Sequence, residues 1–232
     1  MKHWYLTLLI LFGIAGKCAG GAVLDVDETT YYFGSVPQFS KIYHHYWFRS
    51  VGTDTVVIDS INTGCSCVVH DADGLRIPPG DSAQVTIIWD IGRQMNMLGQ
   101  ATDIFYNHSI VPKNIGMRAF VRMDPQGNLP FTIVPYRFEF GQVPGSEISV
   151  DSVQFQVVNT FNHPINIKTV SDPLEGLNIV LPDSVAAKGK AYGYAKLGPQ
   201  LSGKEFYYSV TFQISDEEKS RFTIPVRRKI YE

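Results

Sequence analysis

A five-residue motif occurs twice in this chain of 232 residues and constrains the fold more than any other feature. Phe33-Gly34-Ser35-Val36-Pro37 returns as Phe140-Gly141-Gln142-Val143-Pro144, an offset of 107 residues (140 minus 33). The same offset relates the alternating residues of 46–50 to those of 153–157, as expected for equivalent strands. Self-similarity at this period predicts two tandem copies of about 100 residues each.

Each copy has the pattern of short β-strands separated by turns. Apolar and polar residues alternate at 206–214 in the second copy, which predicts a strand with one buried face. In the first copy, similar patterns predict strands at 42–49, 55–61, 85–89, 101–107 and 116–123. The fold is therefore predicted to be all-β, with two tandem immunoglobulin-like antiparallel β-sandwiches.

The N-terminus resembles an export signal. Lys2 and His3 precede an apolar run at 4–15, and small residues follow it at 19–22. The run is shorter than the roughly 20 residues of a membrane-spanning helix, so we expect no membrane span. A small residue precedes the cysteine in lipoprotein signals, whereas Lys17 precedes Cys18 here, which argues against a lipid anchor. We expect a periplasmic or secreted protein.

These signals divide the chain into a signal peptide at 1–20, a first sandwich at 26–124 and a second at 129–232. Turn-forming residues at 124–128 mark the junction. The net charge of −2 gives no attraction to nucleic acid. No hydrolase, zinc-protease or phosphate-loop motif is present, so we expect no enzyme and no cofactor.

Five motifs in the first copy occur in a fixed order. They are Phe33-Gly34-x-Val36, Gly64-Cys65-Ser66-Cys67, Ile77-Pro78-Pro79-Gly80-Asp81, the alternating segment 85–90, and Gly99 followed by 104–107. Together they resemble a bacterial family of secreted or periplasmic domains, the domain-of-unknown-function family 1573, whose signature is Cys-Gly-Cys-Thr. The resemblance covers about residues 28 to 123.

Membership of this family implies an immunoglobulin-like fold, similar to major sperm protein and pilus-chaperone domains, and a place outside the cytoplasm. It implies no activity. Ser66 and Val68 stand where the signature has Gly and Thr. The second copy has no cysteine and is a degenerate repeat.

Cys65 and Cys67 are the sharpest candidates for chemistry, and three interpretations stay open. The pair is inert or locally structural, or a redox-active disulfide, or part of a metal site with His70. A disulfide would need the chain to turn, because residues two apart in an extended strand lie about 6.6 Å apart. The second copy aligns residues 170–174 with this corner and has no thiol there, so the fold does not need them.

Two further groups of side chains could contribute to a metal site. In an immunoglobulin sandwich the loop that holds the cysteines and the loop that holds Met95 and Met97 emerge at the same end, and thioethers with thiolates suit Cu(I). Methionine is also a common filler where a loop covers a core. His44 and His45 are adjacent on a strand, so they point to opposite faces and are expected to be exposed.

Two hypotheses for function follow. The first is a non-catalytic binding or scaffold protein outside the cytoplasm, whose partner is another envelope or secreted protein bound through an edge strand or loops. The second is a thiol redox or Cu(I)-handling protein that uses Cys65 and Cys67.

Overall fold

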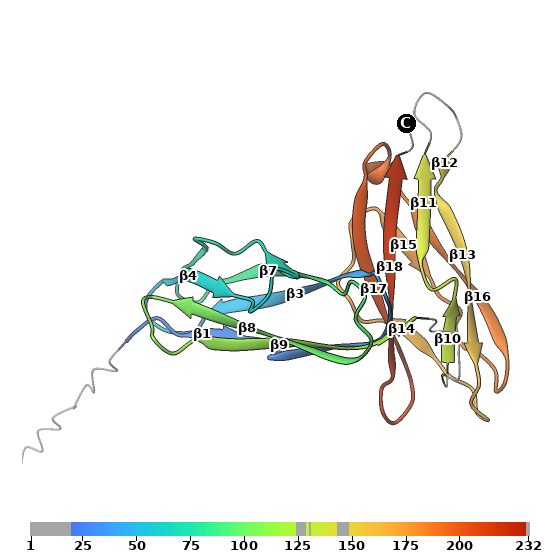
Figure 1. Cartoon of the computed structure of the whole chain (residues 1–232), viewed down its shortest axis with the longest axis horizontal. Coiled ribbons are helices and arrows are strands. Elements are labelled where there is room, and N and C mark those ends of the chain that lie inside the picture. The colour runs from blue at the N-terminus through green and yellow to red at the C-terminus, as the bar shows by residue number, and fades with distance from the viewer. Residues whose placement is uncertain (1–19, 124–128, 130, 143–148, 231–232) are drawn as a thin grey trace, which may run out of the picture.

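The structure, a computed structural model, describes residues 20–123, 129, 131–142 and 149–230, which form two β-sandwiches set at a steep angle to each other (Figure 1). Every described element is a strand except a single 3-10 turn at Pro199–Leu201. The predicted all-β class is confirmed. No helix among the described residues is long and apolar enough to cross a membrane. The predicted signal peptide, Cys18 and the junction at 124–128 fall outside the described residues.

The first sandwich packs two sheets around one core. One sheet has the order β1 (Leu24–Val26), β3 (Lys41–Ser50), β7 (Ser82–Asp90), β5 (Val68–His70). The other has the order β2 (Thr30–Pro37), β9 (Lys113–Arg122), β8 (Asn96–Tyr106), β4 (Val56–Asn62), with β6 (Arg76–Ile77) beside β4. Phe33, Tyr46 and Trp89 are buried between the sheets. All five predicted strands of this copy are present.

The second sandwich repeats the same strand order. One sheet has the order β10 (Phe131–Val134), β13 (Ser152–Asn159), β16 (Lys190–Leu197), β15 (Leu177–Val180). The other contains β11 (Phe138–Gln142), β18 (Arg221–Ile230), β17 (Phe206–Ile214) and β14 (Ile167–Thr169), with β12 (Ser149–Val150) beside β11. Each sheet of this sandwich thus has its counterpart in the first, which is the structural basis of the sequence repeat.

The repeated Phe-Gly motif lies within equivalent strands. Phe33 in β2 and Phe140 in β11 are both buried in the core of their own sandwich. β2 pairs in parallel with β9, and β11 pairs in parallel with β18, so each motif strand lies beside the last strand of its sandwich. Pairs such as β3–β7, β8–β9 and β17–β18 are antiparallel, as predicted. The two parallel pairs arise because the first and last strands of the sheet lie side by side in each sandwich.

A contact between β2 and β18 joins the two sandwiches. Phe222 at the start of β18 pairs with Ser35 in β2, next to a bulge in that strand. Gly34 lies in this bulge with φ of 73°, and a Cβ there would lie 2.0 Å from the Arg221 carbonyl oxygen. Glycine favours this backbone conformation, and only glycine leaves room for this approach. The Thr223 hydroxyl, fully buried, donates to the Phe33 carbonyl at 2.6 Å.

Further polar contacts hold β3 against β17. The Tyr43 amide donates to Ser209 Oγ at 2.9 Å, and the Tyr43 ring lies 5.5 Å from the Tyr208 ring. Arg137, which precedes β11, donates to the carbonyl oxygens of Gln38 and Phe39 in the first sandwich. Several hydrogen bonds therefore cross the interface, one of them fully buried, and they oppose free rotation of one sandwich against the other.

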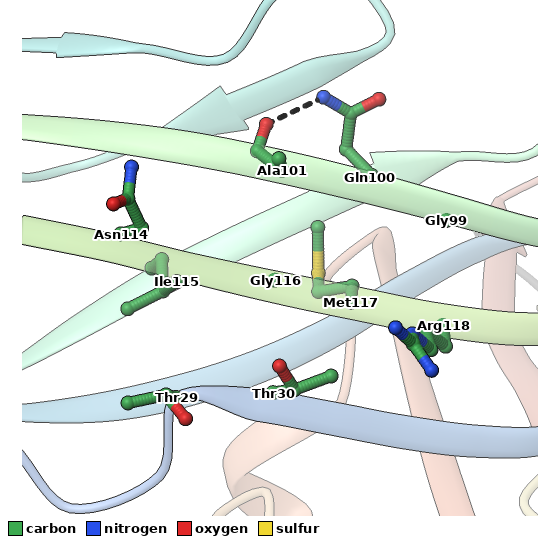
Figure 2. Close-up of a pocket in the computed structure, with 10 residues that line it drawn as sticks. All are labelled: Thr29, Thr30, Gly99, Gln100, Ala101, Asn114, Ile115, Gly116, Met117 and Arg118. Atoms are coloured by element: carbon green, nitrogen blue, oxygen red, sulfur yellow. Dashed lines mark hydrogen bonds between the residues drawn. The ribbon is translucent and has the colours of Figure 1, made fainter.

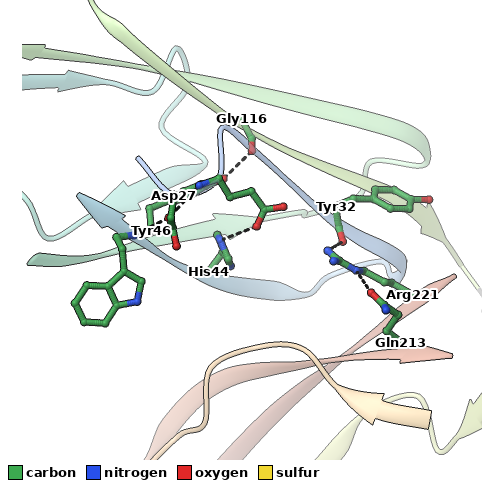
Figure 3. Close-up of polar contacts among 9 residues, drawn as sticks. Asp27, Tyr32, His44, Tyr46, Gly116, Gln213 and Arg221 are labelled. Carbon is green, nitrogen blue, oxygen red and sulfur yellow. Dashed lines mark hydrogen bonds and ion pairs between the residues drawn. The ribbon is translucent and has the colours of Figure 1, made fainter. Parts of the chain in front are cut away.

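Arg221 completes this interface from the second sandwich. Its guanidinium donates to the Tyr32 carbonyl at 2.9 Å and to Gln213 Oε1 at 3.1 Å (Figure 3). It also lies 5.0 Å from the centre of the Tyr31 ring. One side chain thus connects β18, β17 and β2 by hydrogen bonds and by a cation–π contact.

His44 packs against the ring of Tyr31. The two rings are stacked with their centres 3.7 Å apart. His44 Nε2 lies 3.9 Å from a Glu28 carboxylate oxygen. His44 and His45 point to opposite faces, as predicted, but the expectation that His44 is exposed was wrong. It lies on the inward side with Ile42 and Tyr46. Burial lowers the pKa of His44 to about 3, and the charges of His45 and Arg221 act in the same direction.

Stability should therefore fall in mild acid. Unfolded His44 takes up a proton below its ordinary pKa of 6.5, whereas the folded side chain stays neutral down to about 3. The unfolded state binds more protons in this window, so the free energy of unfolding decreases as pH falls from 6.5 toward 3, by at most about 1.4 kcal/mol per pH unit from this group. Urea unfolding at pH 7.5, 5.5 and 4.5 measures the slope.

His44→Phe should reduce that slope, because phenylalanine fits the aromatic surroundings and does not titrate. His108→Gln is the control, since the His108 side chain is 95% exposed. An unchanged slope in His44→Phe would show that His44 does not couple pH to stability.

Candidate functional site

The outward face of the β1-β3-β7-β5 sheet forms one wall of an elbow between the sandwiches. Ile42 and Tyr46 point into the core, so Tyr43, His45 and Trp47 point outward. Near its end this face is covered by Tyr208 of β17, whose ring lies 6.4 Å from that of His45. Further along, the face is open.

Apolar side chains continue along the open part of this wall. Trp47 is 39% exposed and Val69 is 55% exposed, and Val69 lies opposite the outward-facing Ile88 of β7. The sequence analysis did not single out these residues. The alternation that placed Tyr46 inward also placed Trp47 outward, but only the structure shows that the same face meets a second sandwich. We call Tyr43, Trp47, Val69, Ile88, Tyr207 and Tyr208 the elbow surface.

A pocket of about 270 Å³ lies at the corner of the elbow, between the two sandwiches. The first sandwich contributes Lys41 and Asp90, which are register partners in β3 and β7. The second contributes charged and aromatic side chains from β11, β17 and β18. The lining residues used below are Lys41, Asp90, Arg137, Glu139, Tyr207 and Arg227.

Three cations and two carboxylates surround this pocket. Arg227 forms an ion pair with Glu139. Arg137 donates to backbone carbonyls, and burial lowers its pKa while Glu139 acts in the opposite direction. Lys41 Nζ lies 5.3 Å from the centre of the Tyr207 ring. The pocket therefore presents both charge signs and an aromatic ring, a combination suited to polar recognition.

The Cys65-Ser66-Cys67 turn adjoins this corner. The two cysteines form a disulfide, and their Cα atoms are 5.2 Å apart because the chain turns between β4 and β5. The Cys67 carbonyl accepts a hydrogen bond of 2.8 Å from the amide of Asp90, whose residue lines the pocket. The row Lys41–Asp90–Cys67 thus crosses three neighbouring strands at the elbow end of the sheet.

Side chains from a neighbouring strand hold this turn. Gln100 of β8 donates to the Thr63 carbonyl, and its Oε1 lies 3.5 Å from Cys65 Sγ. Thr63 Oγ1 donates to the Cys65 carbonyl at 2.8 Å. In the second sandwich Tyr208 of β17 has a comparable role, since its hydroxyl donates to the Asp172 carbonyl at 2.6 Å. Hydrogen bonds therefore hold the equivalent corner in each sandwich, and only the corner of the first sandwich contains cysteines.

Within the part of the chain that the structure describes, no hydrogen bond or ion pair joins Met95, Met97 or His70 to the disulfide. Met97 lies in β8, not in the expected loop, and Met95 comes just before that strand. Both methionines are exposed, and neither is among the side chains that pack with the cysteines against the first core. His70 Nδ1 lies 3.9 Å from Asp73. Among the described residues, no group of three or more His, Cys, Asp or Glu could hold a metal ion.

A second hollow lies on the outer face of β8 and β9 (Figure 2). It measures about 410 Å³ and exists because Gly99, Ala101 and Gly116 have small side chains or none. Arg118 is the one charged residue that lines it. The hollow lacks the converging charged and aromatic groups of the elbow, so the elbow is the better candidate site.

The sheet edges offer little room for an added strand. The edge strands β1, β5, β10 and β15 have only three or four residues each. The free part of β4 contains a bulge between Ile58 and Ser60, and the charged Asp59 lies in it. Short, bulged and charged edges disfavour strand addition. The predicted docking through an edge strand therefore has less structural support than docking on the elbow surface.

Comparison with known proteins identifies the first sandwich. Residues 24–121 match a family described as "Protein of unknown function (DUF1573)". The first sandwich is similar to this family, and the match covers less than half of the chain. No curated protein sequence matches the chain.

The motifs of the DUF1573 domain serve mainly to build its backbone. Gly34 permits the contact with β18, and Gly80, at φ of 82°, turns the chain after Pro78, whose carbonyl accepts the Asp81 amide. The Asn107 side chain bonds the backbone of Val57 and Thr55 and so ties β8 to β4. These family positions are explained by the fold.

Solved structures with a similar chain path are distant. A protein of unknown function from Porphyromonas gingivalis W83 is 10% identical with a TM-score of 0.36, covering 89% of this chain and 99% of its own. The E. coli chaperone DraB is 11% identical with a TM-score of 0.34, covering 90% and 97%. A PapD-like domain of human CEP192 is 9% identical with a TM-score of 0.39, covering 53% and 99%. At these values none of them assigns a function to this chain.

The disulfide should contribute little to stability. Cys65→Ser combined with Cys67→Ser is expected to lower the free energy of unfolding by less than about 2 kcal/mol, because so short a loop removes little chain entropy and hydrogen bonds hold the turn. Denaturant unfolding of the oxidised wild type and the variant measures the difference. A loss of more than about 4 kcal/mol would show instead that the DUF1573 domain depends on the disulfide.

Proposed function

We propose that this protein is a non-catalytic binding or scaffold protein outside the cytoplasm, and that its partner is another envelope or secreted protein held in the elbow. The observation that carries the proposal is the elbow surface, where apolar side chains of two sandwiches meet a pocket of mixed charge. Aromatic and aliphatic side chains on a preorganised surface are the usual anchors of protein interfaces, with polar groups at the rim.

The fixed angle between the sandwiches supports this assignment. Hydrogen bonds from Thr223, Arg221 and Arg137 cross to backbone carbonyls of the first sandwich. A surface that is ordered before binding loses less entropy when the partner arrives. Export to the periplasm or the cell exterior is part of the proposal, since the apolar run at 4–15 has the form of a signal peptide.

A photo-crosslinking residue placed in the elbow tests the proposal. Replacement of Val69, which is 55% exposed, or Tyr207, which is 46% exposed, should yield one recurrent crosslinked protein from the native cell envelope. The matched control is Ile110, which is 92% exposed in the β8–β9 hairpin and remote from the elbow. The control should not capture the same protein.

Two results would contradict elbow docking. Equal crosslinking from Ile110 would place the partner elsewhere. A complex that forms without a crosslinker, needs Cys65 or Cys67 and dissociates in reductant would instead indicate thiol–disulfide exchange, in which a partner thiolate attacks the disulfide and releases one cysteine as the thiol. One observation favours thiol–disulfide exchange as a second candidate function: the disulfide lies beside the pocket residue Asp90.

A further inference from the structure

The outward face of the β10-β13-β16-β15 sheet lies on the other side of the molecule from the elbow. β13 and β16 stand on the side of the second sandwich that is away from the first (Figure 1). The strand contacts between the sandwiches run through β17 and β18, which belong to the opposite sheet. This face is therefore left open by the elbow.

Two tyrosines stand side by side on this face. Tyr192 is 57% exposed and Tyr194 is 38% exposed, and they occupy alternate positions of β16, about 6.8 Å apart along the strand. The Tyr194 hydroxyl accepts a hydrogen bond of 2.7 Å from Gln154 Nε2 in the neighbouring strand. Gln156 is the register partner of Tyr192. Each ring is thus flanked by a side-chain amide.

Gly193, between the two tyrosines, lets β16 pack close to the core. A Cβ on Gly193 would lie 2.4 Å from a ring carbon of Phe155 and 2.7 Å from the Val180 carbonyl oxygen. Because glycine removes this clash, β16 packs directly on Phe155 and remains regular, with both rings on one side. The two rings are therefore presented by a strand that the core holds in place.

The charge of this face is opposite to that of the whole chain. The outward positions of β16 include Lys190 and Lys196 as well as the tyrosines, and Lys196 Nζ lies 5.5 Å from the centre of the Tyr194 ring. β13, β15 and β16 contain no Asp or Glu, whereas the chain as a whole has a net charge of −2. The face therefore favours an anionic ligand.

We propose that this tyrosine face, defined by Gln154, Gln156, Lys190, Tyr192, Tyr194 and Lys196, binds an acidic polysaccharide. Pyranose rings present apolar C–H faces that stack on aromatic rings, while their hydroxyl groups bond to side-chain amides. Carboxylate or sulfate groups of the polymer pair with the two lysines. Besides the tyrosines, the outward apolar side chains of β13 and β15 include only Val158 and Val180, so amide and lysine groups outnumber the aliphatic ones on this face.

Titration of the mature chain with polygalacturonate, a polymer of uronic acid, tests the proposal. We expect binding that weakens as salt rises, and none to neutral dextran. Tyr192→Ala with Tyr194→Ala should weaken binding at least tenfold. Lys190→Gln with Lys196→Gln should weaken it and reduce its salt dependence. Tyr32→Ala is the control, because Tyr32 is 39% exposed on the first sandwich. Thermal melting confirms that each variant folds.

Several outcomes would overturn the proposal. They are no binding to polygalacturonate or to a sulfated polysaccharide, equal binding to dextran, and equal loss in Tyr32→Ala. Tighter binding of single-stranded DNA of the same length would assign the face to another class of ligand. This test does not depend on docking in the elbow. If crosslinking in the elbow fails, polysaccharide binding is still expected, because the two sites lie on opposite sheets.

Discussion

The close approach of the β18 backbone to β2 is the contact on which the arrangement of this molecule depends. Gly34 has no side chain and a positive φ, so the Arg221 carbonyl can occupy the space where any Cβ would lie. That approach allows Thr223 and Arg221 to donate to the carbonyls of Phe33 and Tyr32. The Thr223 bond is buried, and an unpaired buried polar group costs about 1–3 kcal/mol, so this bond favours one relative orientation of the sandwiches.

The elbow follows from this orientation. With β2 docked on β18, the outward side of β3 meets β17, and Tyr43 packs beside Tyr208. The pocket then collects charged groups that belong to separate sandwiches, Lys41 from one and Arg227 from the other. The disulfide turn lies beside this corner because β5 pairs with the end of β7. The tyrosine face stays uncovered because the first sandwich docks on β17 and β18, whereas this face belongs to the other sheet of the second sandwich.

Much of the fold could be predicted from the sequence. The repeated Phe-Gly motif predicted equivalent strands, and alternation of apolar residues located the strands, since a strand's two faces are visible in its own sequence. The interface could not be predicted, because it depends on Ser35 and Phe222, which are distant in sequence. His44 was misjudged for a related reason. Its ring is stacked on Tyr31 of another strand, and Tyr31 in turn contacts Arg221 of the other sandwich.

A distance measurement between the two sandwiches tests the central claim most directly, that their relative orientation depends on the close contact between β2 and β18. Spin labels at Ser82 and Lys204, both exposed and on different sandwiches, would report the distribution of distances by pulsed electron resonance. A single narrow distribution in the wild type that broadens in Gly34→Val is the predicted result. A broad distribution in the wild type, or a narrow one that survives Gly34→Val, would contradict the account.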